Sequence, residues 1–286
     1  MSKYIITGGQ GFIGSRIVAA TGGHSFDMQA GDDILDVGRL SRAFEGAVGV
    51  FHCAAKISVP ESVAKPEMYH TVNVEGTKNV IETAEKYGLK IVFSSSAAVY
   101  AESDKPVNEE YTLAPKSPYG QNKVDAEALL SRSSVPHIAL RYFNAYGAGQ
   151  SPQYAGVITA FITNALKGND LVIYGDGLQT RDFVFVEDIV EANIAAMNYK
   201  SAGFEVFNIA SGETITIKEL AELIISLVGS HSKIVYKSAR VGDIVRSEAD
   251  ISKAKSMLGW SPKYSLREGL EKTIGFYRGG GVGCGK

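Results

Sequence analysis

The sequence predicts an α/β fold in which a doubly wound parallel sheet is followed by a smaller, interleaved α/β domain. Three short apolar or β-branched runs, Lys3–Thr7, Val48–Cys53 and Leu89–Ser95, are separated by stretches with helical periodicity. Strands that alternate with helices predict parallel pairing, with helices covering both faces of the sheet. His137–Phe143 fits a further strand of the same series.

The pattern changes at about Ala148, where a second domain is expected to begin. The elements predicted there are helices near Val157–Leu166, Thr216–Val228 and Leu266–Tyr277 and a hairpin around Tyr174–Gly177. The run Glu205–Ile209 can return to the main sheet, which would interleave the two domains. We therefore assign 1–147 to the first domain, 148–278 mainly to the second, and the glycine-rich 279–286 to a flexible tail.

Composition excludes several classes of function. The 286 residues are 45% hydrophobic and 21% charged with a net charge of −2, so no basic stripe is expected that would bind nucleic acid or an anionic membrane. The start of the chain offers no signal peptide, and no apolar run reaches the ~18 residues of a membrane span. We expect a cytoplasmic protein. Its two cysteines and five histidines have no metal-ligand spacing, so no metal is expected.

A glycine-rich turn follows the first strand directly and opens a helix. Glycines at 8, 11 and 14 allow a tight turn and a close approach to a pyrophosphate, whose charge then lies at the positive end of the helix. The alternative, a purely structural turn, is disfavoured by the position after strand one. We expect a dinucleotide site of the Rossmann type that includes Gly8, Gly11, Phe12, Ile13 and Gly14.

The adenosine end of this site is expected between residues 27 and 36. Asp33 and Ile34 have the spacing for adenine recognition, in which a carboxylate accepts from the exocyclic amine and the next N–H meets the ring. Asp27 is only a candidate ribose ligand, because the expected second strand, His24–Gln29, ends without an obvious aspartate. The segment holds four aspartates and no Lys or Arg, which would repel a 2′-phosphate and favours NAD over NADP.

Three residues form a candidate catalytic set. Ser117-Pro118 begins a helix that places Tyr119 and Lys123 on one face. A phenol with a pKa of ~10 is only ~0.1% ionised at pH 7, so Tyr119 needs Lys123 and a cationic nicotinamide to lower its pKa before it can act as a general base. Ser96 can hydrogen-bond a substrate hydroxyl and the carbonyl that develops from it. A Tyr-x-x-x-Lys pair alone is more often a feature of an amphipathic helix.

Taken in order, these residues make the sequence resemble the extended short-chain dehydrogenases/reductases, and among them the UDP-glucose 4-epimerases. The resemblance extends from Thr7 to about Tyr277 and departs from the family in two places. The usual aspartate at the end of strand two is missing. In addition, Val99-Tyr100 is followed by Ala101, where a glycine completes the common Val-Tyr-Gly motif. The matching segments are His52–Lys56, Ser58–Ser62, Asn73–Thr77, Ser94–Tyr100, Ser117–Gly120, Leu140–Asn144, Ile173–Gly177, Gln179–Val184, Arg240–Asp243 and Leu258–Trp260.

The resemblance also assigns binding roles. Tyr142 would pack by the nicotinamide, Asn144 would contact the diphosphate region, and Asp243 would reach the uridine ribose. Arg181 and Arg240 would clamp the diphosphate with their guanidinium groups, although isolated arginines more often form surface ion pairs. The residues that would contact NAD are, besides the glycine loop, Asp33 and Ile34, Ala54, Ala55, Lys56, Asn73, Ser94, Tyr119, Lys123 and Tyr142.

One position bears on the size of the sugar. Counting from Arg240 through Asp243, the residue that limits space around the C2 substituent falls at Ser247. A serine leaves room for an N-acetyl group and does not reject a smaller substituent, so both the simple and the N-acetylated hexoses are expected to fit. The alternative is a surface serine with an alignment displaced by a residue or two.

By this resemblance, the expected reaction is 4-epimerisation of a UDP-hexose through a transient 4-keto sugar and tightly bound NAD. A homodimer through the helices containing Asn73–Lys86 and Tyr119–Leu130 is also implied. A nucleotide-sugar ketoreductase is the main alternative, since it needs only the catalytic set. Dehydratases and decarboxylases usually carry an acid after the serine, where this chain has Ala97 and Ala98. A non-catalytic NAD-binding protein would not need the complete set.

Overall fold

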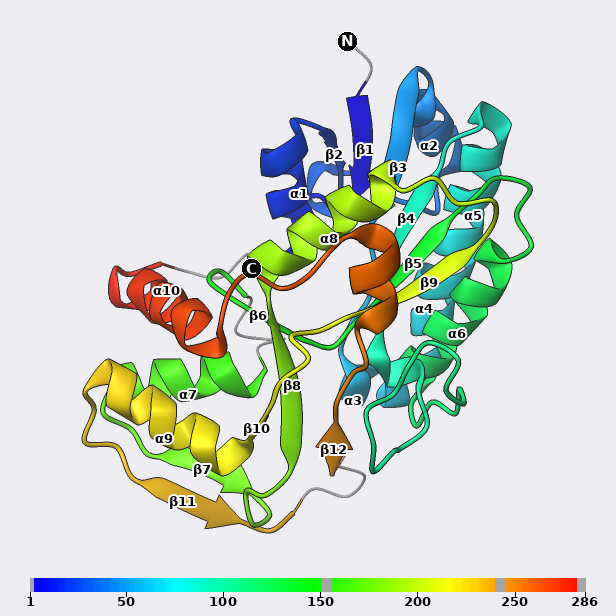
Figure 1. Cartoon of the computed structure of the whole chain (residues 1–286). Coiled ribbons are helices and arrows are strands. Elements are labelled where there is room, and N and C mark those ends of the chain that lie inside the picture. The colour runs from blue at the N-terminus through cyan, green and yellow to red at the C-terminus, as the bar shows by residue number, and fades with distance from the viewer. Residues whose placement is uncertain (1–2, 151–155, 240–244, 282–286) are drawn as a thin grey trace.

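A six-stranded parallel sheet forms the centre of the computed structural model, which describes residues 3–150, 156–239 and 245–281 (Figure 1). The strand order is β2-β1-β3-β4-β5-β9, and every neighbouring pair is parallel. This confirms the predicted doubly wound sheet. The strands are β1 (Lys3–Thr7), β2 (His24–Phe26), β3 (Ala47–His52), β4 (Ile91–Ser96), β5 (Ile138–Tyr142) and β9 (Glu205–Ile209).

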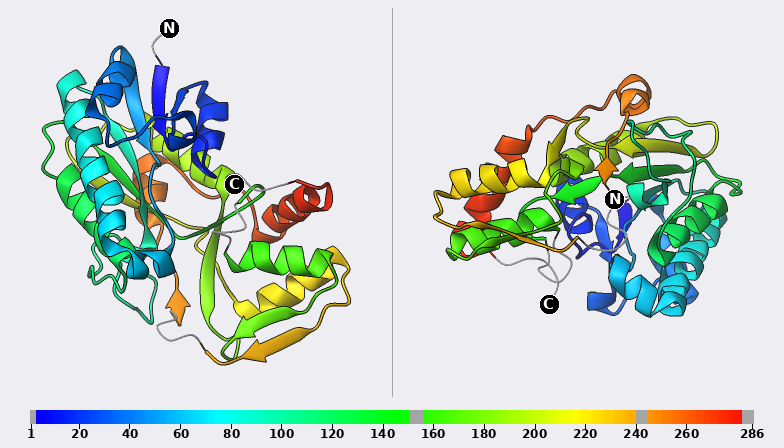
Figure 2. Two further views of the ribbon diagram at one scale, coloured as in Figure 1. Left: turned by 180° about the vertical axis from the view of Figure 1, so that it is seen from behind. Right: turned by 90° about the horizontal axis from the view of Figure 1, so that it is seen from below.

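Helices cover both faces of this sheet (Figure 2). Ile17 of α1 (Gly14–Thr21) and Ile189 of α8 (Val186–Asn198) pack in one core with Phe51 and Val92. The other core contains buried residues from α2 (Val37–Phe44), α5 (Gly76–Tyr87) and α6 (Pro118–Leu130). Burial on both faces explains why the strands appear in the sequence as continuous apolar runs.

The second domain is built from smaller sheets and three helices. β6 (Asn144–Tyr146), β8 (Thr180–Phe185), β10 (Thr214–Thr216) and β12 (Arg246–Ser247) form one sheet, and β7 (Leu171–Tyr174) pairs with β11 (Ile234–Lys237). The helices are α7 (Val157–Leu166), α9 (Ile217–Val228) and α10 (Leu266–Arg278), close to their predicted bounds. Capping boxes begin the last two, at Thr216 with Glu219 and at Ser265 with Glu268.

The predicted hairpin around Tyr174–Gly177 is wrong. β7 pairs in parallel with β11, whereas β8 pairs with β6, β10 and β12, so the two strands lie in different sheets. Gly175 and Gly177 do make a turn, with φ of 83° and 80°, values that glycine adopts without strain. The glycines thus indicated the turn correctly, but the strands that pair with β7 and β8 come from distant parts of the sequence.

The chain returns to the main sheet after entering the second domain. β9 pairs with β5 at the edge of this sheet. The sequence interpretation missed α8, which packs against α1, β4 and β5 on the main sheet. Its burial among apolar groups of the first domain blurs its own amphipathic pattern. The remaining short segments are η1 (Met28–Ala30), α3 (Val59–Ala64), α4 (Pro66–His70), η2 (Thr71–Glu75), η3 (Ala97–Val99) and η4 (Ala254–Leu258).

Strand order locates the binding crevice. From β1 the chain moves to β2 on one side and later to β3 on the other, so the topology reverses between β1 and β3. In doubly wound sheets, ligands bind at the carboxyl ends of the strands beside such a point. The glycine turn after β1 and the segment after β3 both lie there.

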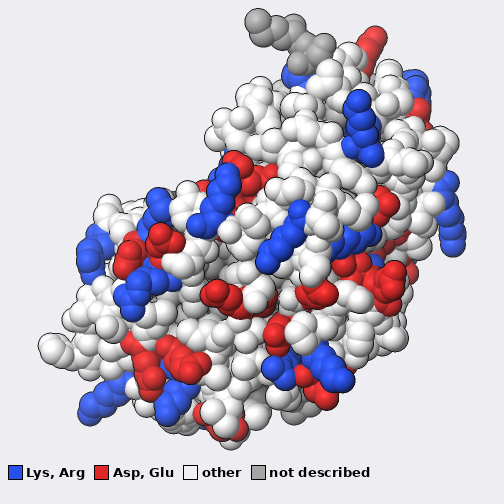
Figure 3. Space-filling model, viewed as in Figure 1, with Lys and Arg blue, Asp and Glu red and all other residues white. Residues whose placement is uncertain are grey.

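The surface has no single dominant charge on the face drawn in Figure 3, where acidic and basic side chains are interspersed. Among the described residues, no helix is long and apolar enough to cross a membrane. In the same part of the chain, no three His, Cys, Asp or Glu side chains gather as a metal site.

Candidate active site

The glycine turn between β1 and α1 has no room for side chains at Gly8, Gly9 and Gly14. A Cβ on Gly8 would lie 2.7 Å from the backbone nitrogen of Ala54, and Gly8 has a φ of 68°. A Cβ on Gly14 would lie 2.1 Å from the carbonyl oxygen of Gly8. The turn and the segment after β3 can therefore meet only through glycine. This contact leaves the N-terminus of α1 facing the crevice.

A cavity of about 700 Å³ occupies this crevice. It is bordered by the glycine turn, the segment that follows β2, the segment after β3, the end of β4 and the catalytic helix α6. The structure brings together all but one of the residues predicted to contact NAD. Those that line the cavity are Gly8, Gly11, Phe12, Ile13, Gly14, Asp33, Ile34, Ala54, Ala55, Lys56, Ser94, Tyr119, Lys123 and Tyr142.

Asn73 is the exception. Its side chain is buried and forms two hydrogen bonds with the backbone of Lys56, accepting from the amide at 2.8 Å and donating to the carbonyl at 2.9 Å. Both polar atoms of the Asn73 amide are therefore occupied by the protein. Asn73 holds the segment that carries Lys56 and does not border the cavity.

His52 supports the same segment from inside the protein. Its Nδ1 lies 2.6 Å from Thr7 Oγ1 and its Nε2 lies 2.9 Å from Thr77 Oγ1. Thr77 Oγ1 donates its proton to the carbonyl of Asn73, so it must accept from His52 Nε2–H. Burial, together with the nearby charge of Lys123, lowers the pKa of His52 to about 3. A neutral histidine thus links β1, β3 and α5.

The adenosine end corrects one expectation. Asp27 follows β2 directly and lines the cavity, so the aspartate that seemed to be missing is present. β2 ends at Phe26, earlier than the predicted end at Gln29. The sequence prediction therefore placed the end of the strand too far along the chain. The carboxylate of Asp27 accepts from the backbone amides of Gln10 and Gln29, each at 2.9 Å, and so joins this segment to the glycine turn.

The three candidate catalytic residues converge on the cavity wall from two elements. Ser96 ends β4, and its Oγ accepts from the amide of Ala98 at 3.1 Å. Ser117 caps α6 by accepting from the Gly120 amide, which sets Tyr119 in the first turn. The Tyr119 and Ser96 side chains line the same cavity, and Ser96 is close enough to affect the pKa of the Tyr119 phenol.

Lys123 lies one helical turn after Tyr119 and is buried. Its Nζ donates to the carbonyl of Ser94 at 2.6 Å and lies 4.6 Å from the ring centre of Phe93 and 5.8 Å from that of Tyr119. Burial lowers the pKa of Lys123 to about 8, while charge on Cys53 and Glu127 acts in the opposite direction.

The expectation of a lowered pKa for Tyr119 is wrong for the protein residues alone. Burial raises the pKa of Tyr119, and only the neighbouring Ser96 side chain acts in the opposite direction. The reason is geometric, since the Lys123 ammonium is bonded to Ser94 instead of the phenol oxygen. Removing water from the site therefore favours the neutral phenol.

Part of the predicted substrate side also comes together. Asn144 Nδ2 donates to the carbonyl of Asp182 at 2.7 Å and lies 3.4 Å from Ser247 Oγ. Arg181 and Ser247 are register partners in β8 and β12. Asn144 lines the first cavity, and Ser247 lines a second cavity of about 590 Å³ that shares Phe143 with it. Arg240 and Asp243 lie outside the described residues.

Several cavity residues were not predicted, among them Met28, Gln29, Phe143 and Gln150. None of these positions carries a charge pattern or spacing that would have indicated a binding role. They reach the cavity from three separate places: the segment after β2, the junction of β5 and β6, and the segment after β6.

Comparison with known proteins agrees with this geometry. The model of the NAD dependent epimerase/dehydratase family matches residues 4–210. The chain belongs to this family. It is 36% identical to a putative UDP-glucose 4-epimerase of Methanocaldococcus jannaschii, over 96% of this chain and 98% of the relative.

Two solved structures extend the comparison. A UDP-N-acetylglucosamine 4-epimerase from Methanobrevibacter ruminantium, in complex with UDP-N-acetylmuramic acid, superimposes with a TM-score of 0.91 at 33% identity, covering 98% of this chain and 99% of that one. The Thermus thermophilus UDP-glucose 4-epimerase complex with NAD superimposes with a TM-score of 0.88 at 31% identity, covering 97% of this chain and 99% of that one. The chain is thus an NAD-dependent enzyme of the UDP-sugar epimerase/dehydratase type.

The residues of the cavity fit this cofactor. The glycine turn permits the close backbone approach that a pyrophosphate needs, at the open N-terminus of α1. Asp27 lies at the end of β2, where the family places a ribose ligand, and Asp33 borders the same end of the cavity. Tyr119 and Lys123 border the cavity next to Ser94 and Tyr142.

The neutral state of His52 predicts a pH dependence of stability. An unfolded histidine binds a proton below pH ~6.5, whereas buried His52 stays neutral down to about pH 3, so stability is lost as pH falls through this window. For His52→Gln, we expect the free energy of unfolding to fall less steeply between pH 6 and pH 4, by about 1.4 kcal/mol per pH unit. Urea unfolding across this range measures it. Exposed His24→Gln is the control, and an unchanged slope in the His52 variant contradicts the assignment.

Proposed function

We propose that the protein interconverts UDP-hexoses that differ in configuration at C4, namely UDP-glucose with UDP-galactose and the corresponding N-acetylated pair. The observation that carries the proposal is that Ser96, Tyr119 and Lys123 line the same wall of the dinucleotide cavity, with Lys123 fixed by its bond to Ser94. This arrangement can move a proton to and from a sugar hydroxyl next to a nicotinamide.

The residues of the chain would share the work as follows. NAD, when bound, supplies reversible hydride acceptance at C4 of the sugar. Tyr119 takes the proton of the C4 hydroxyl and returns it, and Ser96 holds the same oxygen through the reaction. Lys123 supplies positive charge close to the phenol while Ser94 fixes its position. The exclusion of water by the surrounding side chains strengthens each of these interactions.

The diphosphate of the substrate would lie toward the second domain. Asn144 on β6 lines the first cavity, and Arg181 lies on the neighbouring strand β8 as the register partner of Ser247. Guanidinium groups suit bidentate contact with phosphate, and we propose that Arg181 and Arg240 share this role. Asp243 is proposed to bind the uridine ribose.

Two other reactions of the family can be weighed against this proposal. Dehydration and decarboxylation usually employ an acid next to the catalytic serine, but Ala97 and Ala98 follow Ser96. Among the described residues that line the first cavity, the carboxylates are Asp27, Asp32 and Asp33, all from the segment after β2. A ketoreductase needs only the catalytic set, and it would have to exchange its nucleotide in every turnover.

The role of Tyr119 can be tested by substitution. Tyr119→Phe should lower kcat for UDP-glucose by at least ~10²-fold, because it removes the general base while conserving the ring. Circular dichroism and NAD content should remain those of the wild type. Tyr236→Phe, at an exposed position of β11, is the matched control. Turnover within a few-fold of wild type in the Tyr119 variant would exclude this mechanism.

Ser247 gives a test of the sugar specificity. We expect the wild type to epimerise both UDP-glucose and UDP-N-acetylglucosamine, because a small side chain stands beside Asn144 at the junction of the two cavities. Ser247→Tyr should lower kcat/KM for the N-acetylated sugar at least ~10-fold relative to UDP-glucose, since steric exclusion is selective for the larger group. The proposal fails if the wild type does not use the N-acetylated pair or if the variant loses both activities equally.

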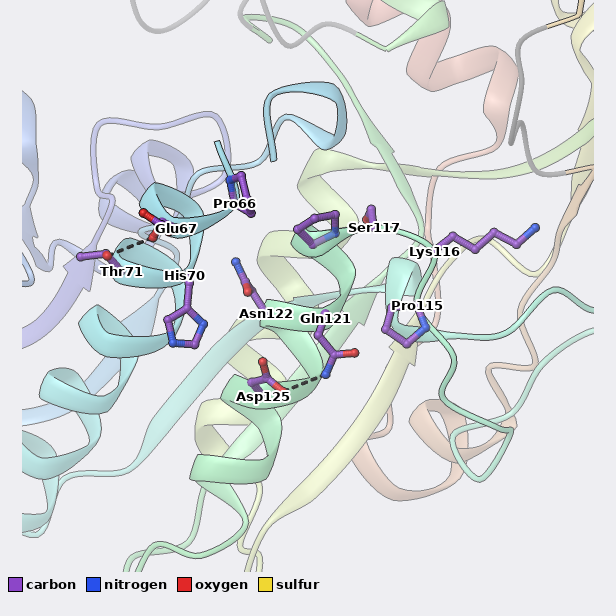
Figure 4. Close-up of a pocket in the computed structure, with 11 residues that line it drawn as sticks. Pro66, Glu67, His70, Thr71, Pro115, Lys116, Ser117, Gln121, Asn122 and Asp125 are labelled. Atoms are coloured by element: carbon purple, nitrogen blue, oxygen red, sulfur yellow. Dashed lines mark hydrogen bonds between the residues drawn. The ribbon is translucent and has the colours of Figure 1, made fainter. Parts of the chain in front are cut away.

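We also propose that the protein is a homodimer through the face formed by α4, α5 and α6. A cleft of about 690 Å³ lies between α4 and the start of α6 (Figure 4). Asn122 lines this cleft, and its buried Nδ2 has no acceptor among the described residues. That atom is enclosed by the chain itself, so the surface offered to a second copy is the cleft and the exposed side of α6.

Light scattering tests this assembly directly. The wild type should have twice the mass of the chain, and Gln121→Arg should shift it toward the monomer, because the substitution places a cation on the exposed side of α6 in both copies. Arg267→Glu on α10 serves as the control. A wild-type mass equal to that of one chain would contradict the proposal.

A further inference from the structure

Arg16 connects two parts of the chain that border the cofactor cavity. Its Nη1 donates to the carbonyl of Phe12 at 2.6 Å, within the glycine turn. Its Nη2 donates to the carbonyl of Ala148, in the segment after β6. Phe12 lines the cavity from the first of these parts, and Ala145 and Gln150 line it from the second. One guanidinium group therefore joins segments that are more than 130 residues apart in sequence.

The second segment is itself held firmly by the rest of the protein. A Cβ on Gly147 would lie 2.5 Å from Val186 Cγ1, which shows how closely the backbone packs against α8. The Gln150 side chain accepts from Thr159 Oγ1 at 3.1 Å, and its backbone carbonyl accepts from Tyr277 Oη at 3.1 Å. The segment thus moves with α7 and α10, and Arg16 ties these elements to the glycine turn.

The position of Arg16 is unfavourable unless an anion is nearby. Arg16 lies in the first turn of α1, where the helix dipole disfavours a positive charge. The acidic partner found among the described residues is Glu187, whose Oε1 is 3.9 Å from Arg16 Nε. That distance is too long for a hydrogen bond. A pyrophosphate bound at the same helix end would offset the positive potential of both the helix and the guanidinium.

We propose that Arg16 is a positioning residue that holds the two sides of the cofactor cavity together and thereby retains NAD. It does so by two charge-assisted hydrogen bonds to backbone carbonyls, which cross-link the glycine turn and the segment Ala145–Gln150. Escape of the dinucleotide would require these segments to separate. The inference depends on NAD binding and does not require the proposed epimerase reaction.

The rate of NAD release tests this role without any turnover. Holoenzyme is separated from free NAD, diluted, and sampled over time for the nucleotide that remains bound, which is quantified after denaturation. Arg16→Ala should release NAD at least ~10-fold faster than wild type, because affinity differences within one site are expressed mainly in dissociation rates. Arg16→Lys, which keeps one charge but not the fork, should lie between the two. Arg267→Ala, at an exposed site on α10, should match the wild type within twofold.

Two further measurements separate positioning from general stability. The melting temperature of NAD-free Arg16→Ala should stay within a few degrees of NAD-free wild type, and its affinity for UDP should be unchanged. A release rate within twofold of wild type would overturn the proposal. So would a large fall in the melting temperature together with weaker UDP binding, because Arg16 would then stabilise the fold as a whole. A protein that fails to epimerise UDP-hexoses but shows the expected release rates would refute the proposed function and leave this inference standing.

Discussion

The buried ion pair between Arg141 and Glu127 sets the geometry on which the active site depends. Arg141 on β5 donates from Nε and Nη2 to the two carboxylate oxygens of Glu127 on α6, at 3.0 and 2.6 Å. Ser95 Oγ donates to the same carboxylate at 2.5 Å. Burying two charges is costly, and bidentate geometry with an extra donor is what makes such a pair tolerable. The ion pair fixes α6, which carries Tyr119 and Lys123, against β5, and the Ser95 bond fixes it against β4, the strand that ends at Ser96.

The same network reaches the substrate side. Arg141 Nη1 also donates to Tyr100 Oη at 2.9 Å, and Tyr100 donates to the buried amide of Asn208 on β9 at 2.6 Å. Asn208 in turn donates to the backbone carbonyl of Val107. The backbone amide of Val107 donates to the carbonyl oxygen of Glu248 at 3.0 Å. Glu248 follows Ser247 in the chain. The position that would limit the size of the sugar is therefore connected, bond by bond, to the helix that would move the proton.

The site combines this rigid polar frame with buried groups whose charge the protein does not favour. Burial raises the pKa of Tyr119 and lowers that of Lys123 to about 8, so the dry pocket works against ionising either group. His52 does not line the cavity. It is kept neutral and links Thr7 to Thr77 by hydrogen bonds.

Local spacing in the sequence was enough to predict the parallel sheet, the glycine turn, most of the NAD cavity and the placement of Tyr119 and Lys123 on one helix face. These features depend on apolar runs, glycine intervals and a capped helix start. Long-range contacts instead place β7 and β8 in different sheets, bond Asn73 to Lys56 away from the cavity, and set Asp27 directly after the end of β2. The same contacts bury Tyr119, which raises its pKa, and let Arg16 join two segments that border the cavity. Each of these depends on groups brought together from distant parts of the chain, and local patterns carry no information about such partners.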